Sequence, residues 1–519
     1  YGIGHGCSVE WTQKTKSGPD TISTSFLPRH EVKHATTQLD SENKEASGKI
    51  LQLQYLMNEK RHSGKLKSEL NQFLDGYKEW IKIISDKTVE HCHIDAKKRV
   101  VERLIESEQR MRSGINCIVE NRLVYKSFCL ANRAMLMQMV HSRDDYGGKI
   151  KNRGNHFIEP DYDSEKFAGY SWRPFQLAFF LLVVRSMVDK DCDERKYMDL
   201  IWFPTGGGKT EAYLALAAFE IFRRRLENGE EGLGTAVIKR YTLRLLTTQQ
   251  FQRASTLICA CEALRKIEAK DLLGEPFTLG LWVGGENSPN HFTTNKETGK
   301  GSLELYETMR NADKPENEFQ LQKCPWCGTR IVPEYIKEDD GYYGITATET
   351  TFKFFCPSQN CPFHNRIPVS VVDEDLFQSP PTMLIGTIDK FARLAWDNRA
   401  KVFFGAKSRG ILPPSLIIQD ELHLISGPLG TIAGIYESAI DTLIECCGAP
   451  AKIIAATATI RRADDQVKKL YAREVRIFPS PGIDSDDSYF SREDKSRPGR
   501  LYMGVMGQGH TPLTALVHL

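Results

Sequence analysis

The sequence has no excess charge of either sign and no long hydrophobic run. Its 519 residues contain 69 Lys and Arg against 67 Asp and Glu, a net charge of +2. No global basic field therefore marks the chain as a nucleic-acid binder, and any basic surface must be local. The longest strongly apolar stretch, Leu177 to Val184, is far shorter than the roughly 20 residues that a membrane-spanning helix needs. We expect no membrane partner.

Cysteine is present in an odd number, 13, which in so long a chain indicates reduced thiols in the cytoplasm, some of them available to a metal. With 40% hydrophobic and 26% charged residues, the composition excludes a wholly disordered or collagen-like chain. The length corresponds to roughly three domains. No signal peptide is visible, but the chain starts at Tyr1 rather than Met, so Tyr1 need not be the true start.

Residues 1–160 are predicted to form an N-terminal domain, with a short β-containing region over about residues 1–40 followed by helices. Apolar residues there recur every three or four positions, which places them on one face of a helix. They are Val101, Leu104, Ile105, Met111, Ile115, Ile118 and Val119, with Leu53, Leu56, Leu66, Leu70 and Phe73 upstream. We interpret Arg99, Arg103, Arg110 and Arg112 on the same helix as a solvated face. Residues 141–170 are rich in Gly, Asp, Asn and Lys, which predicts a linker or mobile loop.

From about Trp172 onward, short buried strands alternate with helices. This pattern is typical of a parallel sheet covered on both faces, and it predicts an α/β fold. The predicted strands are Leu200–Trp202, Thr235–Ile238, Thr382–Ile385, Leu416–Ile418 and Lys452–Ala455.

Residues 203–210, Phe-Pro-Thr-Gly-Gly-Gly-Lys-Thr, lie between a predicted strand and a predicted helix, the context of a phosphate-binding P-loop. The glycines let successive backbone N–H groups converge on phosphate oxygens. Lys209 would reach the β- and γ-phosphates of ATP, and the Thr210 hydroxyl would ligate Mg²⁺. Phe203 departs from the general pattern, which begins with Gly or Ala, and a glycine-rich strand-to-helix turn is the alternative. The predicted nucleotide-binding residues of the loop are Thr205, Gly206, Gly207, Gly208, Lys209, Thr210 and Glu211.

A second signal for ATP chemistry lies much later in the chain, where an apolar strand leads into Asp420-Glu421-Leu422-His423. A strand ending in Asp-Glu places a second carboxylate at the Mg²⁺ of a P-loop ATPase. Asp420 would hold the metal mostly through its water shell, and Glu421 would act as general base on the attacking water. His423 would link the nucleotide state to the rest of the lobe. The predicted catalytic residues are Lys209, Asp420, Glu421 and His423.

Two further segments complete a resemblance to superfamily 2 DExH helicases. Thr457-Ala458-Thr459 is similar to their coupling motif, and Trp172 to Gln176 resembles their glutamine motif, in which Phe175 and Gln176 would bind adenine. A surface polar residue is the alternative for Gln176, and a Thr-rich strand end is the alternative for Thr457 and Thr459. The resemblance covers about residues 172–515 and implies the first of two RecA-like lobes.

Two more segments resemble the DNA-backbone motifs of the same superfamily. One runs from Arg240 to Gln249 and the other from Gly386 to Lys390. Hydroxyls, amides and arginines at strand ends suit phosphate contacts, which position a nucleic-acid strand without reading its sequence. The predicted DNA-binding residues are Arg240, Thr242, Arg244, Gln249, Thr387 and Lys390.

Four cysteines lie between these two motifs. Cys324 and Cys327 form a knuckle, and Cys356 and Cys361 form a looser pair after 28 residues. Two such pairs bring four thiolates into a tetrahedral site, the usual arrangement for structural Zn²⁺. His364 is a spare ligand if Cys356 or Cys361 is not used, and the alternative is four unrelated thiols. Because a closed site has no open position for catalysis, we interpret the insertion as a staple of the fold.

Several longer stretches resemble the helicase subunit of the DISARM phage-defence system (DrmA-like). They are WRPFQLAF, WFPTGGGKTEAYLALAAF, RYTLRLLTTQQ, GTIDKFARLAW, IIQDELHLISGPLG and LANRAML, together with the zinc insert. The resemblance implies a bacterial cytoplasmic ATPase that uses ATP and Mg²⁺ as a DNA helicase or translocase, together with a second core subunit (DrmB-like). The alternative is a DNA-binding scaffold subunit that uses ATP only as a conformational switch.

The predicted fold is therefore a RecA-like P-loop lobe, a parallel sheet with helices on both faces, with an inserted zinc module and a mostly helical N-terminal domain. Residues 161–285 form the first part of the lobe, 286–379 the four-cysteine zinc module, and 380–519 the second part with the start of a crossing near Arg500 to a second lobe. That lobe, with its arginine finger, is expected outside this sequence. The chain alone is expected to hydrolyse almost no ATP.

Overall fold

The structure is a computed structural model that describes residues 7–12, 19–25, 28–39, 48–60, 63–142, 157–203, 207–241, 248–285, 288–294, 299–334, 343–405, 410–458, 462–484, 487–494 and 497–504. Its centre is an eight-stranded sheet in the order β10-β7-β11-β6-β12-β13-β5-β14, parallel throughout. The strands are β5 (Met198–Trp202), β6 (Val237–Tyr241), β7 (Leu279–Trp282), β10 (Val369–Ser370), β11 (Met383–Thr387), β12 (Leu416–Gln419), β13 (Lys452–Thr457) and β14 (Val475–Phe478). The five predicted strands are all present, and the α/β prediction is confirmed.

Successive side chains of the strands enter two separate cores, because side chains alternate between the faces of a sheet. In β12, Leu416 and Ile418 join one apolar cluster, whereas Ile417 joins the other. The first cluster lies under α7 (Pro174–Val188), α8 (Lys209–Asn228) and α9 (Thr248–Ile267). The second lies under α12 (Ile388–Ala392), α13 (Gly427–Cys447) and α14 (Ala463–Tyr471). Burial on both faces explains why these strands are continuous apolar runs.

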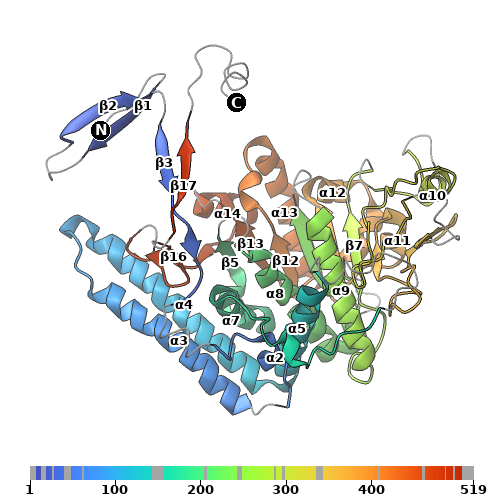
Figure 1. The fold of residues 1–519 in the computed structure, drawn as a ribbon, viewed down its shortest axis with the longest axis horizontal. Helices are drawn as coiled ribbons and strands as arrows, with labels where there is room; N and C mark the ends of the chain where they lie inside the picture. The colour runs from blue at the N-terminus through green and yellow to red at the C-terminus, as the bar shows by residue number, and fades with distance from the viewer. Residues whose placement is uncertain are drawn as a thin grey trace.

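The N-terminal domain contains α2 (Leu53–Leu56), α3 (Ser63–Asp86), α4 (Ile94–Glu120) and α5 (Arg122–His141), with α3 and α4 as a long helical hairpin (Figure 1). Helix α4 packs against α7, and α5 packs against α8 and α9. The apolar face of α4 is confirmed for Leu104, Met111 and Ile115, which are buried, whereas Ile105 is exposed. A Cβ at Gly114 would lie 1.9 Å from the Leu181 carbonyl oxygen, so the close approach of α4 to α7 requires glycine. The helical domain thus shares its core with the sheet.

The first forty residues contain the predicted β structure. A hairpin of β1 (Ser8–Thr12) and β2 (Thr21–Ser25) is followed by β3 (Arg29–Val32) and β4 (Ala35–Thr36). Strand β3 pairs with β17 (Arg500–Met503), and β4 pairs with β16 (Ser491–Glu493), which also pairs with β15 (Asp487–Ser488). Segments from the two ends of the described chain therefore lie side by side (Figure 1).

The inserted module contains α10 (Ser302–Arg310), β8 (Ile345–Ala347), β9 (Phe352–Phe354) and α11 (Asp373–Gln378). Its stretch 286–379 also includes β10, which pairs with β7 and forms the edge of the main sheet. The insertion is therefore continuous with the lobe. Within the described ranges, no helix combines the length and the apolar character needed to cross a bilayer.

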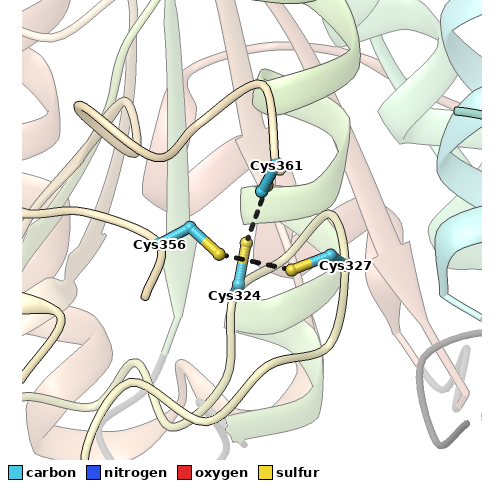
Figure 2. A group of neighbouring side chains, drawn as sticks. All are labelled: Cys324, Cys327, Cys356 and Cys361. Atoms are coloured by element: carbon cyan, nitrogen blue, oxygen red, sulfur yellow. Dashed lines mark hydrogen bonds between the residues drawn. The ribbon is translucent and has the colours of Figure 1, made fainter. Parts of the chain in front are cut away.

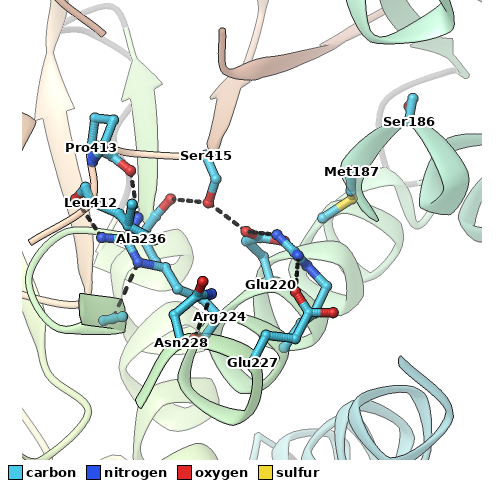
Figure 3. A network of polar contacts seen from close by, with 12 residues as sticks. Ser186, Met187, Glu220, Arg224, Glu227, Asn228, Ala236, Leu412, Pro413 and Ser415 are labelled. Atoms are coloured by element: carbon cyan, nitrogen blue, oxygen red, sulfur yellow. Dashed lines mark hydrogen bonds and ion pairs between the residues drawn. The ribbon is translucent and has the colours of Figure 1, made fainter. Parts of the chain in front are cut away.

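At the amino-terminal ends of the strands, a polar network holds the loop that leads into β12 (Figure 3). The guanidinium of Arg224 donates to the carbonyl oxygens of Gly232, Leu233, Leu412 and Pro413. Glu220 accepts hydrogen bonds from Ser415 and Arg223. Helix α8 is thereby fixed to the start of the strand that carries Asp420.

One of the arginines assigned to a solvated face is instead buried. Arg110 of α4 is 6% exposed, and both of its terminal nitrogens lie 2.8 Å from the carboxylate oxygens of Asp199 on β5. Lys452 Nζ on β13 lies 2.7 Å from Asp199 Oδ2. The prediction failed for Arg110 because its partner carboxylate lies on a distant strand. The N-terminal domain is thus joined to the sheet by a buried ionic cluster.

We predict that Asp199→Asn will lower the free energy of unfolding by about 3–5 kcal/mol, because it leaves two buried cations without a countercharge. The measurement is thermal and denaturant unfolding of the variant beside the wild type. Glu79→Gln is the matched control: Glu79 pairs with Lys82, both side chains are more than half exposed, and the expected loss is below about 1 kcal/mol. Equal stability of the Asp199 variant and the wild type would contradict the role of this cluster.

Candidate nucleotide site and candidate metal centre

The carboxyl ends of β5, β13 and β12 lie next to one another in the sheet, at the edge where open α/β sheets bind ligands. The P-loop follows β5, Thr457 ends β13, and Asp420 follows β12. Helix α8 begins at Lys209 after Gly208, whose φ of 93° lies in the left-handed region. The helix N-terminus contributes a partial positive charge here. Thr205 and Gly206 lie outside the described residues.

Lys209 supplies a buried positive charge at this edge. Its Nζ donates to the carbonyl oxygen of Phe203 at 2.6 Å, and no carboxylate of the described residues lies within ion-pair distance of it. Burial lowers the pKa of Lys209, and the nearby carboxylates of Glu421 and Asp420 oppose that shift. A buried ammonium group with one hydrogen bond to the described residues suits an anionic ligand such as the β- and γ-phosphates.

Arg173 and Gln176 at the start of α7 hold the P-loop. Gln176 Nε2 donates to the Gly208 carbonyl oxygen at 2.8 Å, and its Oε1 accepts from the Arg173 backbone N–H at 2.8 Å. An Arg173 guanidinium nitrogen donates to the Gly207 carbonyl oxygen. A Cβ at Gly208 would lie 2.8 Å from Gln176 Nε2, so this position requires glycine for space as well as for φ.

The two residues predicted to bind adenine therefore have structural contacts in this conformation. Both ends of the Gln176 amide bond to the protein, and the side chain is 4% exposed. Phe175 is completely buried and stacks on Phe203, with ring centroids 3.9 Å apart. This stacking explains the departure at the first P-loop position, since the Phe203 ring packs in the core against Phe175. Adenine binding by Phe175 and Gln176 stays a prediction.

Tyr213 and Lys239 belong to the site although the sequence analysis missed them. The Tyr213 hydroxyl donates to Asp420 Oδ2 at 2.6 Å and lies 3.3 Å from Thr210 Oγ1. Lys239 Nζ donates to the Tyr213 hydroxyl at 3.0 Å, and burial lowers the Lys239 pKa to about 8. Thr210 and Asp420, the residues expected at Mg²⁺, are thus linked through one hydroxyl. Tyr213 lies four positions after Lys209, a spacing that shares a helix face.

Glu421 and His423 lie where β12 ends. Glu421 adopts a φ of 47°, and its backbone N–H donates to Asp420 Oδ1 at 3.0 Å. Burial, followed by the neighbouring Asp420 carboxylate, raises the pKa of Glu421, as suits a general base. His423 Nδ1 lies 2.9 Å from Thr457 Oγ1 and 3.4 Å from Glu421 Oε2. His423 therefore joins the ends of β12 and β13. Thr459 lies outside the described residues.

Among the predicted DNA-binding residues, three lie in the interior. Arg240 is completely buried and ion-paired with Glu437 of α13, and Thr387 is buried at the end of β11. Lys390 is buried and donates to Asp373 at 2.5 Å and to Asn290 at 2.9 Å. In this conformation none of the three side chains presents its polar group to a phosphate in solvent, because all three are buried.

The remaining three DNA predictions concern one stretch of chain. Gln249 is exposed in the first turn of α9, at the carboxyl edge of β6. Thr242 and Arg244 lie outside the described residues. Of the predicted DNA-binding residues that the structure describes, Gln249 has an accessible side chain.

The four predicted metal ligands lie together in the insertion (Figure 2). The four sulfurs lie within 4.8 Å of one another and all four residues are buried; Cys324 Sγ is 3.9 Å from Cys361 Sγ, and Cys327 Sγ is 3.3 Å from Cys356 Sγ. Tetrahedral Zn²⁺ with bonds of roughly 2.3 Å would separate its sulfurs by roughly 3.8 Å. The donor set therefore fits a structural zinc ion.

Local backbone bonds shape both cysteine pairs. The Gly328 N–H donates to the Cys324 carbonyl oxygen at 3.0 Å, and Gly328 has a φ of 73°. His364 Nδ1 lies 2.7 Å from the Cys356 carbonyl oxygen. His364 is thus placed to orient the second pair, and it does not belong to the cluster of four sulfurs.

The first cysteine pair also contacts the N-terminal domain, through a residue that the sequence analysis did not single out. Trp326 stacks on His141 at the end of α5, with ring centroids 3.8 Å apart, and its carbonyl oxygen lies 2.6 Å from His141 Nδ1. Trp326 Nε1 donates to Glu159 Oε2 at 2.8 Å. Part of the predicted linker, which includes Glu159 and the buried Tyr162, is therefore packed against the module.

We predict that the purified protein carries about one zinc ion per chain, with Zn–S distances of roughly 2.3 Å. Replacing Cys324 and Cys327 together by Ser should abolish the bound metal and lower the unfolding temperature, because the four thiolates share one ion. Elemental analysis and X-ray absorption measure the first effect, and thermal unfolding the second. Cys446→Ser, at an exposed cysteine of α13, should retain both. A metal-free protein of full stability would contradict the assignment.

Comparison with known proteins identifies a relative that aligns over the whole chain. No protein-family model matches the chain. The chain is 34% identical over 569 aligned residues to the DISARM protein DrmA of Bacillus paralicheniformis, an alignment that includes 100% of the chain and 49% of that protein. The chain thus spans about half the length of this curated relative.

Two solved structures are similar to the chain at low sequence identity. The Mycobacterium smegmatis helicase Lhr bound to ssDNA and AMP-PNP is 14% identical with a TM-score of 0.30, over 58% of this chain and 27% of that one. The yeast DEAD-box splicing factor Prp28 is 13% identical with a TM-score of 0.31, over 64% and 54%. The assignment to a RecA-like lobe therefore depends on the parallel sheet itself and on the P-loop at its edge. The predicted resemblance is confirmed by sequence: over its whole length, the chain is a homologue of the DISARM protein DrmA.

Proposed function

We propose that this protein is the ATP-driven DNA helicase or translocase subunit of a DISARM anti-phage defence system. The observation that carries the proposal is the meeting of Lys209, Asp420 and Glu421 at one edge of a parallel sheet. Glu421 has a raised pKa and lies beside the buried Lys209 and beside Asp420, which is placed as a metal-binding aspartate would be. This arrangement suits nucleotide hydrolysis. A protein that only binds nucleotide has no need of the Glu421 carboxylate at this position.

Each residue of the candidate site has a separate role in the proposed ATP hydrolysis. Lys209 and the N-terminus of α8 would hold the phosphates, and Asp420 with Thr210 would hold Mg²⁺, which supplies charge neutralisation at the phosphates when bound. Glu421 would take a proton from the attacking water. His423, bonded to Thr457, would pass a change at the end of β12 to the end of β13.

The relative DrmA, of which this chain spans about half the length, supports the assignment to a DISARM system. We further propose action on DNA, a second core subunit (DrmB-like) and a further RecA-like lobe with an arginine finger, as the resemblance to DISARM helicase subunits implies. A trans-acting arginine contributes about 10³ to 10⁵ in rate, so we propose that turnover needs the second lobe. The competing function is a DNA-binding scaffold that uses ATP only as a conformational switch, and such a protein would bind ATP without DNA-stimulated turnover.

We predict that Lys209→Ala in the full-length protein removes nucleotide turnover, because the phosphates lose their buried cation. Glu421→Gln should keep ATP binding and reduce kcat by about 10²- to 10⁴-fold, the range for loss of a general base. Steady-state phosphate release and binding of a fluorescent nucleotide are measured with and without DNA. Glu445→Gln, at an exposed carboxylate of α13, is the control. Unchanged turnover in either site variant would refute the site, and ATP binding without DNA-stimulated turnover in the wild type would favour the switch.

We predict that DNA affinity falls steeply as salt increases and varies little with base sequence, because phosphate contacts dominate it. Substitution of Arg244 by Gln should weaken binding to all sequences alike and reduce the slope of log K against log salt by about one. Gln249→Ala should weaken all sequences alike without changing that slope. Titrations at several salt concentrations test both. A strong preference for one short duplex sequence that survives high salt would contradict the proposal.

A further inference from the structure

Trp396 is the most exposed of the large apolar side chains in the described residues, at 84%. It follows the 3₁₀ turn η6 (Arg393–Ala395), and its backbone N–H donates to the Arg393 carbonyl oxygen at 2.9 Å. The flanking chain is anchored in the core by Phe403 and Phe404 of η7 (Asn398–Phe404), which are buried. A segment anchored in the core therefore holds a largely exposed indole ring, and solvation of this ring in water is unfavourable.

The chain around Trp396 is locally basic. The described residues 389–405 contain four Lys or Arg and two Asp, and one of the four, Lys390, is buried and paired with Asp373. Of these residues, Arg393, Arg399 and Lys401 are exposed. Asp397, directly after Trp396, is ion-paired with Arg399 at 2.8 Å, and Glu374 and Asp373 also lie near Arg399, so the charge of Arg399 is offset within the protein. Arg393 and Lys401 are thus exposed cations beside Trp396 that form no ion pair within the described residues, and they are available to an anionic partner.

The position of this segment is also informative. It follows β11 and α12, and therefore leaves the sheet from the carboxyl edge that carries the nucleotide site. Strand β11 lies beside β6, whose carboxyl end leads towards Gln249. A strand of nucleic acid that follows this edge from α9 would reach the segment of Trp396.

A protein partner would favour a different surface. Stable protein interfaces contain a contiguous apolar centre, but the other exposed residues of 389–401 are charged, polar or small: Asp389, Arg393, Ala395, Asn398, Arg399 and Lys401. A single aromatic ring among cations is instead the composition of surfaces that stack unpaired bases and contact the phosphates between them.

We infer that Trp396 is a stacking platform for an unpaired base of single-stranded DNA, with Arg393 and Lys401 contacting the adjacent phosphates. This inference rests on the proposed function, since it names the form of DNA and a residue that binds it. The ring recognises the face of any base, so the contact is independent of sequence. It would mark single-stranded DNA, whose bases are free to stack, against the closed duplex.

The test measures binding of the full-length protein to two labelled oligonucleotides by fluorescence anisotropy. One is a mixed-sequence single strand, and the other has the same length with consecutive abasic sites in its centre. Trp396→Ala should weaken binding to the first by roughly 5- to 100-fold, the range for loss of one stacked base. It should leave binding to the abasic strand unchanged. Trp396→Phe should retain most of the affinity, since a ring remains.

Two further variants separate stacking from charge. Arg393→Gln combined with Lys401→Gln should weaken both oligonucleotides alike and lower the salt dependence by about two phosphate contacts. Trp11→Ala, at an exposed tryptophan of β1, should change neither affinity. Because Trp396 is almost fully exposed, its variants should have the thermal stability of the wild type.

The outcomes distinguish the two levels of the proposal. A wild-type protein that binds neither single-stranded nor duplex DNA at low salt would overturn the proposed function and this inference with it. If the wild type binds duplex but not single-stranded DNA, only the inference fails. If the wild type binds and Trp396→Ala binds equally well, the inference fails while the proposed function stands. An equal loss on the base-containing and abasic strands would also overturn it, because Trp396 would then shape the segment rather than stack on a base.

Discussion

The carboxylate of Asp199, buried between two cations from different parts of the chain, is the constraint on which the architecture depends. It lies on β5, the strand that ends in the P-loop, and it binds Arg110 of the N-terminal domain and Lys452 of the neighbouring strand β13. Since charges buried this deeply persist only when paired, the three elements fix one another's positions. The register of β5 against β13 in turn brings Thr457 beside the P-loop strand. The buried ion cluster at one end of β5 thus helps to set the geometry of the candidate nucleotide site at the other end.

Much of the fold could be predicted from the sequence because its strands are buried on both sides and therefore read as short apolar runs. The strands that the sequence analysis missed lack this signature. Strand β7 contains Gly280, and β14 alternates apolar residues with the charged Arg476. Asp420 and Glu421, the carboxylates proposed to be catalytic, could be predicted because they directly follow such a run. The four cysteines could be predicted from spacing alone.

Buried charges were the part that sequence could not reveal. Arg and Lys usually lie at the surface, so Arg110, Arg240 and Lys390 gave no sign of burial in the sequence. Their carboxylate partners come from other elements and are Asp199, Glu437 and Asp373, respectively. The pattern of one segment cannot show which distant acid faces it, so their placement followed only from the tertiary structure. Tyr213 and Lys239 escaped notice for the same reason: a tyrosine in an apolar helix and a lysine in an apolar strand gain their meaning only where they meet Asp420.

The stacking of Trp326 on His141 has a thermodynamic consequence for the metal module. The knuckle that presents Trp326 takes its shape from cysteines that would hold zinc, so the free energy of docking on α5 adds to the free energy of metal binding. Linkage makes this reciprocal. Any event that draws α5 away from Trp326 must weaken zinc binding by the same factor by which loss of zinc weakens the docking. The insertion and the N-terminal domain, far apart in sequence, would therefore share a single equilibrium.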